Sequence, residues 1–233
     1  MPGATLFDSA TDYYFNTTTP PSGNLTFTCW TKIAVDRDAA STPFAIDGGD
    51  LNCVLLLTDA TGTNTFIYHN GAFNPGTGFG ATVGTWYKNA YVRNGTVGTF
   101  YFAAAGSPMS NLVGTAAAFT PTEVSIGANR RTATTQFFNG SIAAVKLWTA
   151  ALTAAEIDCE FNQYDPVRRT NLQRYYSFAN GPQTNDESGG GFTLTAGAGA
   201  LTTDTAGPPI PRTIVRKPMV VPASVAVADS FNW

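Results

Sequence analysis

The segment 24–35, NLTFTCWTKIAV, alternates between two sets of side chains that point to opposite sides of an extended backbone. Apolar residues dominate one set, and threonine recurs in the other. This alternation predicts a half-buried antiparallel strand, because one face of such a strand packs on a core while the other meets water. The core-facing set is Leu25, Phe27, Cys29, Thr31 and Ile33, and the opposite set is Thr26, Thr28, Trp30 and Lys32.

Short strands separated by turn signals recur through most of the chain. Thr, Gly, Ala, Phe and Tyr are abundant while Lys, Glu and Leu are scarce, a composition that favours strands over helices. Asn94-Gly95, between KNAYVR and TVGTFYFA, is the strongest hairpin signal. With 233 residues the chain is long enough for one substantial core, so we predict an all-β fold in which two antiparallel sheets pack as a β-sandwich. The other predicted strands are 43–47, 53–58, 64–69, 85–93, 97–104, 122–127, 138–148, 173–179 and 191–196.

One short helix is predicted at 154–162, although the E-x-D-x-E spacing found there also resembles the catalytic signature of laminarinase-type and lichenase-type β-glucanases. That chemistry needs a strand, on which Glu156, Asp158 and Glu160 would share a face. On a helix Asp158 points away from the two glutamates. The residues that precede this segment decide between the two interpretations.

Helix-start signals converge on this segment. Thr153 and Glu156 have the spacing of a capping box, in which each side chain bonds the backbone N–H of the other residue. Leu152 and Ile157 occupy the two positions of a hydrophobic staple. The helix is therefore the favoured interpretation, which gives Glu156 a structural role, makes Glu160 a solvated side chain and leaves no catalytic residue assigned.

The segment 138–157, FNGSIAAVKLWTAALTAAEI, closely resembles the closing segment of laminin-G-like, concanavalin A-like jelly-roll domains, of the kind found in phage structural proteins. In that family a turn glycine precedes a strand, and a short A-L-[ST]-x-x-E-[IV] helix follows. Residues 6–15 resemble the family's first strand, and 174–199 resemble its strand with a D-x-SGNG loop. The resemblance implies a jelly-roll domain over residues 1–205, with the fold of the glucanases but generally not their active site.

Family members that bind calcium use a few carboxylates together with backbone carbonyls, so the resemblance makes Asp186, with Asp8 or Asp12, the metal candidate. This loop offers few carboxylates, whereas hard-cation sites usually recruit several. The alternative places Asp186 in an Asx-type turn, followed by glycines at positive φ. We therefore expect no cofactor, with calcium at Asp186 as the alternative.

His69 is the only histidine, which excludes a multi-histidine metal site and makes a Ser-His-Asp triad depend on one residue. A surface or hydrogen-bonded structural histidine is the simpler account. The odd number of cysteines, with no CxxC pair, indicates neither a disulfide framework nor a zinc site. Cys29, Cys53 and Cys159 are expected to be small buried residues.

Seven aromatic residues are candidates for stacking on sugars, because an exposed aromatic face suits a pyranose ring. Alternation along strands turns about half of such residues inward. Glycan binding is therefore an inference at the level of the fold. The seven residues are Tyr13, Tyr14, Trp86, Tyr87, Trp148, Tyr175 and Tyr176.

The charge pattern and the N-terminus bear on partners and location. The formal net charge is −3 and only 12% of residues are charged, without a Lys/Arg cluster, so nucleic acid is not an expected partner. No apolar run reaches the length of a membrane span. The N-terminus, MPGATLFDSATDYYF, lacks the features of a signal peptide, and we expect synthesis in the host cytoplasm.

The composition changes near Gly207, and residues 206–233 are predicted to form an extended, Pro-rich and apolar C-terminal arm. Apolar residues that follow a complete domain need a surface on which to dock. This surface is either the chain's own sandwich or, by β-addition or groove binding, a neighbouring subunit. The candidate docking residues are Ile214, Val215, Met219, Val220, Val221, Val225, Val227, Phe231 and Trp233.

Together these features predict a non-enzymatic structural or interaction protein of the virion, as a bacteriophage capsid decoration or tail component anchored through its arm. Its expected partners are other virion proteins or neighbouring subunits in an oligomer or larger assembly, with cell-surface glycans as a further class. Two alternatives stay open: a carbohydrate-binding module or lectin that acts alone, and a β-glucanase.

Overall fold

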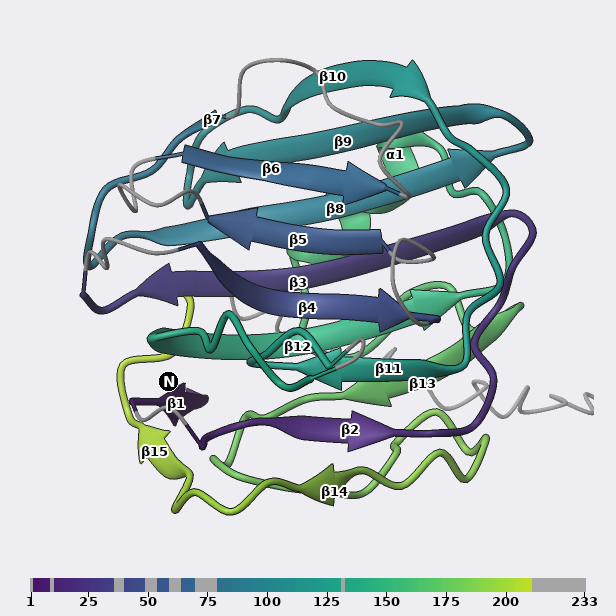
Figure 1. Ribbon diagram of the computed structural model, residues 1–233. Helices are drawn as coiled ribbons and strands as arrows, with labels where there is room; N and C mark the ends of the chain where they lie inside the picture. Colours follow the sequence, from purple (N-terminus) through teal and green to yellow (C-terminus); the bar gives the residue numbers. More distant parts are fainter. Residues whose placement is uncertain are drawn as a thin grey trace, which may run out of the picture.

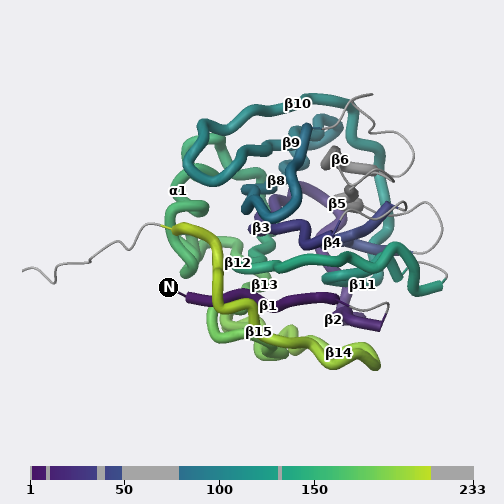
Figure 2. The backbone as a smooth tube through the Cα atoms, turned by 90° about the vertical axis from the view of Figure 1, so that its left-hand side faces the viewer, coloured from purple at the N-terminus to yellow at the C-terminus, as the bar shows by residue number. Residues whose placement is uncertain are grey.

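The computed structural model describes residues 2–8, 11–35, 40–48, 54–58, 64–69, 79–130 and 133–210. In this part of the chain two antiparallel sheets face each other, and one helix, α1 (Ala154–Phe161), lies against the outer side of one sheet (Figure 1 and Figure 2). This arrangement confirms the predicted all-β jelly roll with one short helix. None of the described residues belongs to a helix with the length and hydropathy needed to cross a bilayer.

Sheet A carries α1 on its outer side and contains eight of the described strands. Seven of them follow one another in a hydrogen-bonded row, and β13 pairs with the second half of β12. The predicted hairpin at Asn94-Gly95 joins β8 to β9, and Gly95 has a φ of +61°, which glycine adopts without steric cost. The strands, with β13 last, are β10 (Ser110–Thr115), β9 (Val97–Ala104), β8 (Trp86–Asn94), β3 (Leu25–Ile33), β12 (Gly140–Trp148), β1 (Ala4–Phe7), β15 (Thr202–Asp204) and β13 (Leu172–Tyr176).

Sheet B lies opposite and contains seven of the described strands. Its two edge strands are short, and the strand predicted at 191–196 is reduced to one of them, β14. In row order the strands are β14 (Thr195–Ala196), β2 (Tyr14–Asn16), β11 (Glu123–Ile126), β4 (Ser41–Asp47), β5 (Val54–Thr58), β6 (Asn64–His69) and β7 (Phe79–Gly80).

The segment 6–15, predicted as one strand, is divided between the two sheets. β1 ends at Phe7 in sheet A, and β2 begins at Tyr14 in sheet B. Both rings are buried in the core between the sheets, edge to face with centroids 6.1 Å apart. The prediction of a single strand was wrong because the resemblance on which it rested does not reveal where the chain changes sheets.

Both faces of β3 are buried, which corrects the prediction of a half-buried strand. Phe27 points into the core between the sheets, where its ring centroid is 4.5 Å from that of Phe44. Trp30 points the other way and is only 2% exposed, because it packs beneath α1 with its ring edge-on to Phe161. The helix therefore covers the face of β3 that the sequence pattern assigned to water.

β12 contains a one-residue bulge near the helix. Between Ala143 and Lys146 the pairing advances three residues along β12 but only two along β3, and Ala144 has a φ of +48°. Before the bulge Ile142 packs in the core between the sheets, and after it Val145 does so. Lys146 is thereby placed on the outer face, toward α1.

The start of α1 confirms the helical interpretation of its sequence. The Thr153 hydroxyl accepts a hydrogen bond from the Glu156 backbone N–H at 3.3 Å, and the Glu156 carboxylate accepts one from the Thr153 N–H at 2.8 Å. Leu152 and Ile157 are both buried in the apolar cluster beneath the helix, as a hydrophobic staple requires.

Glu160 is not the solvated side chain that the helical pattern suggested. Its carboxylate is buried and lies 2.9 Å from the Nζ atom of Lys146. It also accepts hydrogen bonds from the backbone N–H groups of Val167 and Arg168, while Lys146 donates to the carbonyl of Gln163. This buried ion pair fastens α1 and the segment that follows it to β12.

Candidate functional site

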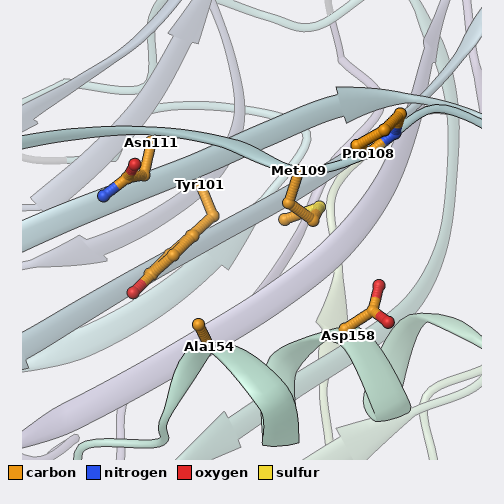
Figure 3. Close-up of a pocket in the computed structure, with 6 residues that line it drawn as sticks. All are labelled: Tyr101, Pro108, Met109, Asn111, Ala154 and Asp158. Carbon is orange, nitrogen blue, oxygen red and sulfur yellow. The ribbon is translucent and has the colours of Figure 1, made fainter.

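A groove of about 400 Å³ lies between α1 and the two strands at one edge of sheet A, β9 and β10 (Figure 3). One side is formed by β9, β10 and the turn between them, and the other by two residues of α1. The lining residues are Tyr101, Pro108, Met109, Asn111, Ala154 and Asp158.

Tyr101 reaches the groove because strand alternation turns it away from the core. Its neighbours Phe100 and Phe102 point between the sheets and are 0% and 5% exposed, so Tyr101 points to the opposite face. Asn111 is the register partner of Tyr101 on β10, which brings an amide next to a phenol ring. Met109, in the turn, packs against the apolar cluster beneath α1 and gives the groove an apolar floor.

Ala154 and Asp158 form the helix side of the groove. They are four residues apart and therefore share a helix face, and Figure 3 shows both pointing from α1 toward the sheet. The Asp158 side chain is 61% exposed, and one of its oxygens is 4.0 Å from the Nζ atom of Lys88, whose side chain is 10% exposed. Asp158 thus offers an accessible carboxylate whose charge is partly offset by a single ammonium.

The groove combines an aromatic ring and apolar side chains with an amide and a carboxylate. Binding sites for small organic ligands have this composition, in which apolar surface supplies contact and a few polar groups fix orientation. A sugar presents C–H groups on its faces and hydroxyl groups around its edge. The ring of Tyr101 can pack against the C–H groups, and the polar atoms of Asn111 and Asp158 can form hydrogen bonds with the hydroxyl groups.

The three acidic residues of the E-x-D-x-E pattern do not form a glycosidase pair. Glu156 is held by the cap and by Arg168, whose Nη1 atom lies 2.6 Å from its carboxylate, and hydrogen bonds from Thr153 lower its pKa. Glu160 is enclosed in its ion pair, and Asp158 alone lines the groove. A retaining glycosidase holds two carboxyl groups on opposite sides of one linkage, whereas each of these carboxylates faces different surroundings.

A smaller pocket of about 210 Å³ lies along another side of α1. Two of its polar side chains, Glu156 and Arg168, already pair with each other. Cys159 also lines it and is exposed, which corrects the prediction that this cysteine is buried. Cys29 is buried as predicted, and burial raises the pKa of its thiol, while Cys53 lies outside the described residues.

Six of the seven aromatic residues considered for sugar stacking are buried, which corrects that interpretation. Tyr13 is the exception, and it lies beside Arg130, whose guanidinium carbon is 5.6 Å from the ring centroid. Tyr101 was missed, although its place between two inward phenylalanines in FYF signals an outward aromatic residue. The buried residues are Tyr14, Trp86, Tyr87, Trp148, Tyr175 and Tyr176.

Asp186 forms the predicted Asx-type turn. One carboxylate oxygen accepts from the backbone N–H of Ser188 at 2.9 Å and of Tyr175 at 3.0 Å, and the other accepts from Phe192 at 3.1 Å. The loop's own donors thus engage both oxygens. β6 ends at His69, whose side chain lies outside the described part of the chain.

The other two calcium candidates lie near the end of β1. Asp12 is buried and accepts a hydrogen bond from the backbone N–H of Asp8 at 2.9 Å. Across the described ranges, no group of three or more His, Cys, Asp or Glu side chains is placed to hold a metal ion.

The arm was predicted at 206–233, and its nine proposed docking residues, which fall between 214 and 233, lie outside the described residues. The described chain ends at Ile210, which packs against the apolar cluster beneath α1. Just before it, the carbonyl of Ala206 accepts a hydrogen bond from the indole of Trp86 at 2.9 Å. The last described residues therefore lie on the helix-bearing side of sheet A (Figure 2).

The two sheets, their strand order and the outer helix define a concanavalin A-like jelly roll. The chain belongs to the Concanavalin A-like lectin/glucanases superfamily, whose laminin-G-type profile matches residues 8–158. This match confirms the family resemblance seen in the sequence. No curated protein matches the chain.

Solved structures of other proteins share this fold. A protein from Bacteroides ovatus, provisionally described as carbohydrate binding, has a TM-score of 0.58 and 14% identity over 91% of this chain and 62% of its own. The enzymatically active domain of tailspike protein 2 from bacteriophage CBA120 has a TM-score of 0.55 and 15% identity over 72% of this chain and 28% of its own. The chain thus spans less than two thirds of either protein, and at these identities the likeness shows the fold alone.

Proposed function

We propose that this chain is a non-enzymatic carbohydrate-binding module of a virus particle, and that it recognises saccharides in the groove between α1 and the β9–β10 hairpin. The observation that carries the proposal is the lining of that groove, where the ring of Tyr101 lies among the polar groups of Asn111 and Asp158. Membership of a superfamily that includes lectins supports it. So does the shared fold of the Bacteroides ovatus protein.

Two further observations support the non-enzymatic and virion parts of the proposal. Each acidic residue of α1 other than Asp158 is already engaged in a structural contact, which leaves no paired carboxylates on the groove. The fold is shared with a bacteriophage tailspike domain, and 23 residues rich in Val and Pro, 211–233, follow the last described residue. Both the shared fold and these C-terminal residues fit a capsid decoration or tail component. In this proposal residues 211–233 anchor the protein to other virion proteins or to neighbouring subunits.

Glycan-array binding by the full chain, followed by titration calorimetry on the glycans that bind, tests the recognition site. Tyr101→Ala removes the stacking ring, and Asp158→Ala removes a charged acceptor. Asp158→Ala is expected to weaken binding about tenfold or more, because a hydrogen bond to a charged group contributes about 1.5–3 kcal/mol and 1.4 kcal/mol is a factor of ten. Tyr101→Ala is expected to weaken binding as well, because it removes the apolar surface on which the sugar stacks. Tyr13→Ala, at a partly exposed tyrosine just before β2 of sheet B, is the matched control and should bind as the unmodified chain does. Binding that neither groove variant alters refutes the site.

Two more measurements separate the alternatives. Bound glycans are expected to be recovered intact after incubation. Hydrolysis that disappears in Glu156→Gln and Glu160→Gln variants shown by circular dichroism to remain folded would instead establish a glucanase. A chain that stops at Ile210 is expected to bind glycans but to be missing from purified particles. If the shortened chain is still incorporated into particles, the arm is not the anchor, and a lectin that acts alone becomes the better account.

A further inference from the structure

The outer face of sheet A continues beyond the groove as a strip on β9 and β10 that α1 does not cover. Its side chains occupy the alternate positions that point away from the core, as Tyr101 does. Val113 is 63% exposed and Val97 is 47% exposed, so no described segment covers them. Across the two strands the register pairs Tyr101 with Asn111, Thr99 with Val113, and Val97 with Thr115.

The strip is long enough to hold more than one sugar. From Val97 to Tyr101 the strand advances four residues, or about 13 Å at about 3.3 Å per residue. The groove extends this surface at the Tyr101 end. Thr99 and Thr115 add hydroxyl groups between the methyl groups of the valines, so the strip has the same mixture of apolar surface and hydrogen-bonding groups as the groove itself.

The charges along this surface favour a neutral ligand. β9 and β10 contain no charged residue, and the carboxylate of the lining is Asp158. The ammonium of Lys88 is nearly buried and lies 5.9 Å from the centre of the Trp30 ring, where it offsets Asp158 but is poorly placed to meet a ligand. A sugar acid would therefore bring its carboxylate toward Asp158 without gaining a new cation partner, whereas neutral hydroxyl groups can donate to it.

We propose, on the basis of the glycan-binding function proposed above, that the groove and the strip together bind an internal stretch of a linear neutral glycan. One sugar residue stacks on Tyr101 between β9 and α1, and its neighbours along the glycan lie over Thr99 and Val113. Asn111 and Asp158 bind hydroxyl groups at the edge of the first residue.

The test measures affinity against chain length and charge. Manno-oligosaccharides and laminari-oligosaccharides, from the disaccharide to the hexasaccharide, serve as neutral probes, and oligogalacturonates of equal length serve as acidic ones. The neutral hexasaccharides are expected to bind at least tenfold more tightly than the disaccharides, and the oligogalacturonates more weakly than either neutral series. Val113→Asp should weaken hexasaccharide binding at least tenfold and disaccharide binding less, while Val83→Asp, at a valine of comparable exposure outside the strip, should change neither.

The outcomes separate this inference from the function on which it rests. If no glycan of either charge binds, and none binds on an array, the proposed function fails. If glycans bind in a manner that depends on Tyr101 but without a gain from added sugar residues, or without a loss in Val113→Asp, the groove stands and the extended strip is refuted. Tighter binding of the oligogalacturonates refutes the preference for neutral chains.

Discussion

Replacing Lys146 with methionine tests the ion pair that fastens α1 to β12. The Lys146 side chain is 1% exposed and that of Glu160 is 0% exposed. Methionine fills a similar volume without a charge, so the Glu160 carboxylate stays buried with the backbone N–H groups of Val167 and Arg168 as its remaining donors. Removing one partner of a buried pair leaves an uncompensated charge, which costs about 3–5 kcal/mol.

Burial lowers the pKa of the Lys146 ammonium, and attraction to Glu160 offsets only part of that effect. Removing the two charges from water therefore costs free energy. The ion pair contributes mainly by offsetting that cost, because each buried charge is stabilised by the other. The double variant Lys146→Met with Glu160→Gln should consequently lose less stability than the sum of the two single variants, by up to about 3 kcal/mol.

Urea unfolding followed by tryptophan fluorescence measures these changes. Trp148 donates its indole N–H to the carbonyl of Arg168 at 2.8 Å and so reports on the same segment. A loss of about 3–5 kcal/mol corresponds to a fall in Tm of about 6–20 °C for a domain of this size.

The control is Arg168→Gln, which removes the ion pair with Glu156 on the same helix. The two side chains of that pair are 27% and 36% exposed, and its loss should cost about 0–1 kcal/mol. If Lys146→Met lowers the free energy of unfolding by no more than Arg168→Gln does, burial does not make the Lys146–Glu160 pair more costly to break than an exposed pair, and this reasoning is refuted.

Two further predictions concern backbone strain and pH. Gly127 and Gly84 have similar φ values, +86° and +81°, but a Cβ at Gly127 would lie 2.4 Å from the Phe7 ring, while nothing lies within 4 Å of one at Gly84. Gly84→Ala should cost about 1–2 kcal/mol, and Gly127→Ala about 1–3 kcal/mol more, in chemical denaturation; equal losses would contradict the packing. Folding lowers the pKa of Glu156 from 4.5, so the ionised carboxylate stabilises the folded chain. The unmodified chain should therefore be more stable than Glu156→Gln by its full margin above pH 4.5, and this margin should vanish as the pH falls through the pKa of Glu156 in the folded chain. Denaturant unfolding of both chains at neutral and acidic pH measures the difference in their free energies of unfolding. A difference that is the same at every pH would contradict this prediction.

The elements of the fold were predictable wherever a local pattern determines them. The alternation in β3, the Asn94-Gly95 hairpin and the Thr153 cap are each encoded within a dozen residues, and the structure contains all three. Burial was harder to predict because it depends on what distant segments cover. Trp30 and Glu160 occupy positions that face water on an isolated strand and an isolated helix, and the packing of α1 against sheet A buries both.

The groove was not predictable for the same reason. Tyr101 and Asn111 come from one hairpin, while Asp158 comes from a helix more than 40 residues later in the chain. Only the packing of α1 on sheet A brings these segments together. The E-x-D-x-E spacing drew attention to the correct helix, but the residue of the three that lines the groove is Asp158, the one that the helical pattern separates from the two glutamates.

The bulge at Ala144 makes the length of β12 as important as its composition. Without that extra residue, every side chain from Val145 onward would exchange faces, so Lys146 would enter the apolar core and Val145 would turn toward α1. A single-residue deletion here is therefore equivalent to a simultaneous polarity reversal along the rest of the strand. Among relatives, the number of residues between the start of this strand and the helix cap should be constant wherever the Lys–Glu pair is kept, and a relative of different length should have lost both charges together.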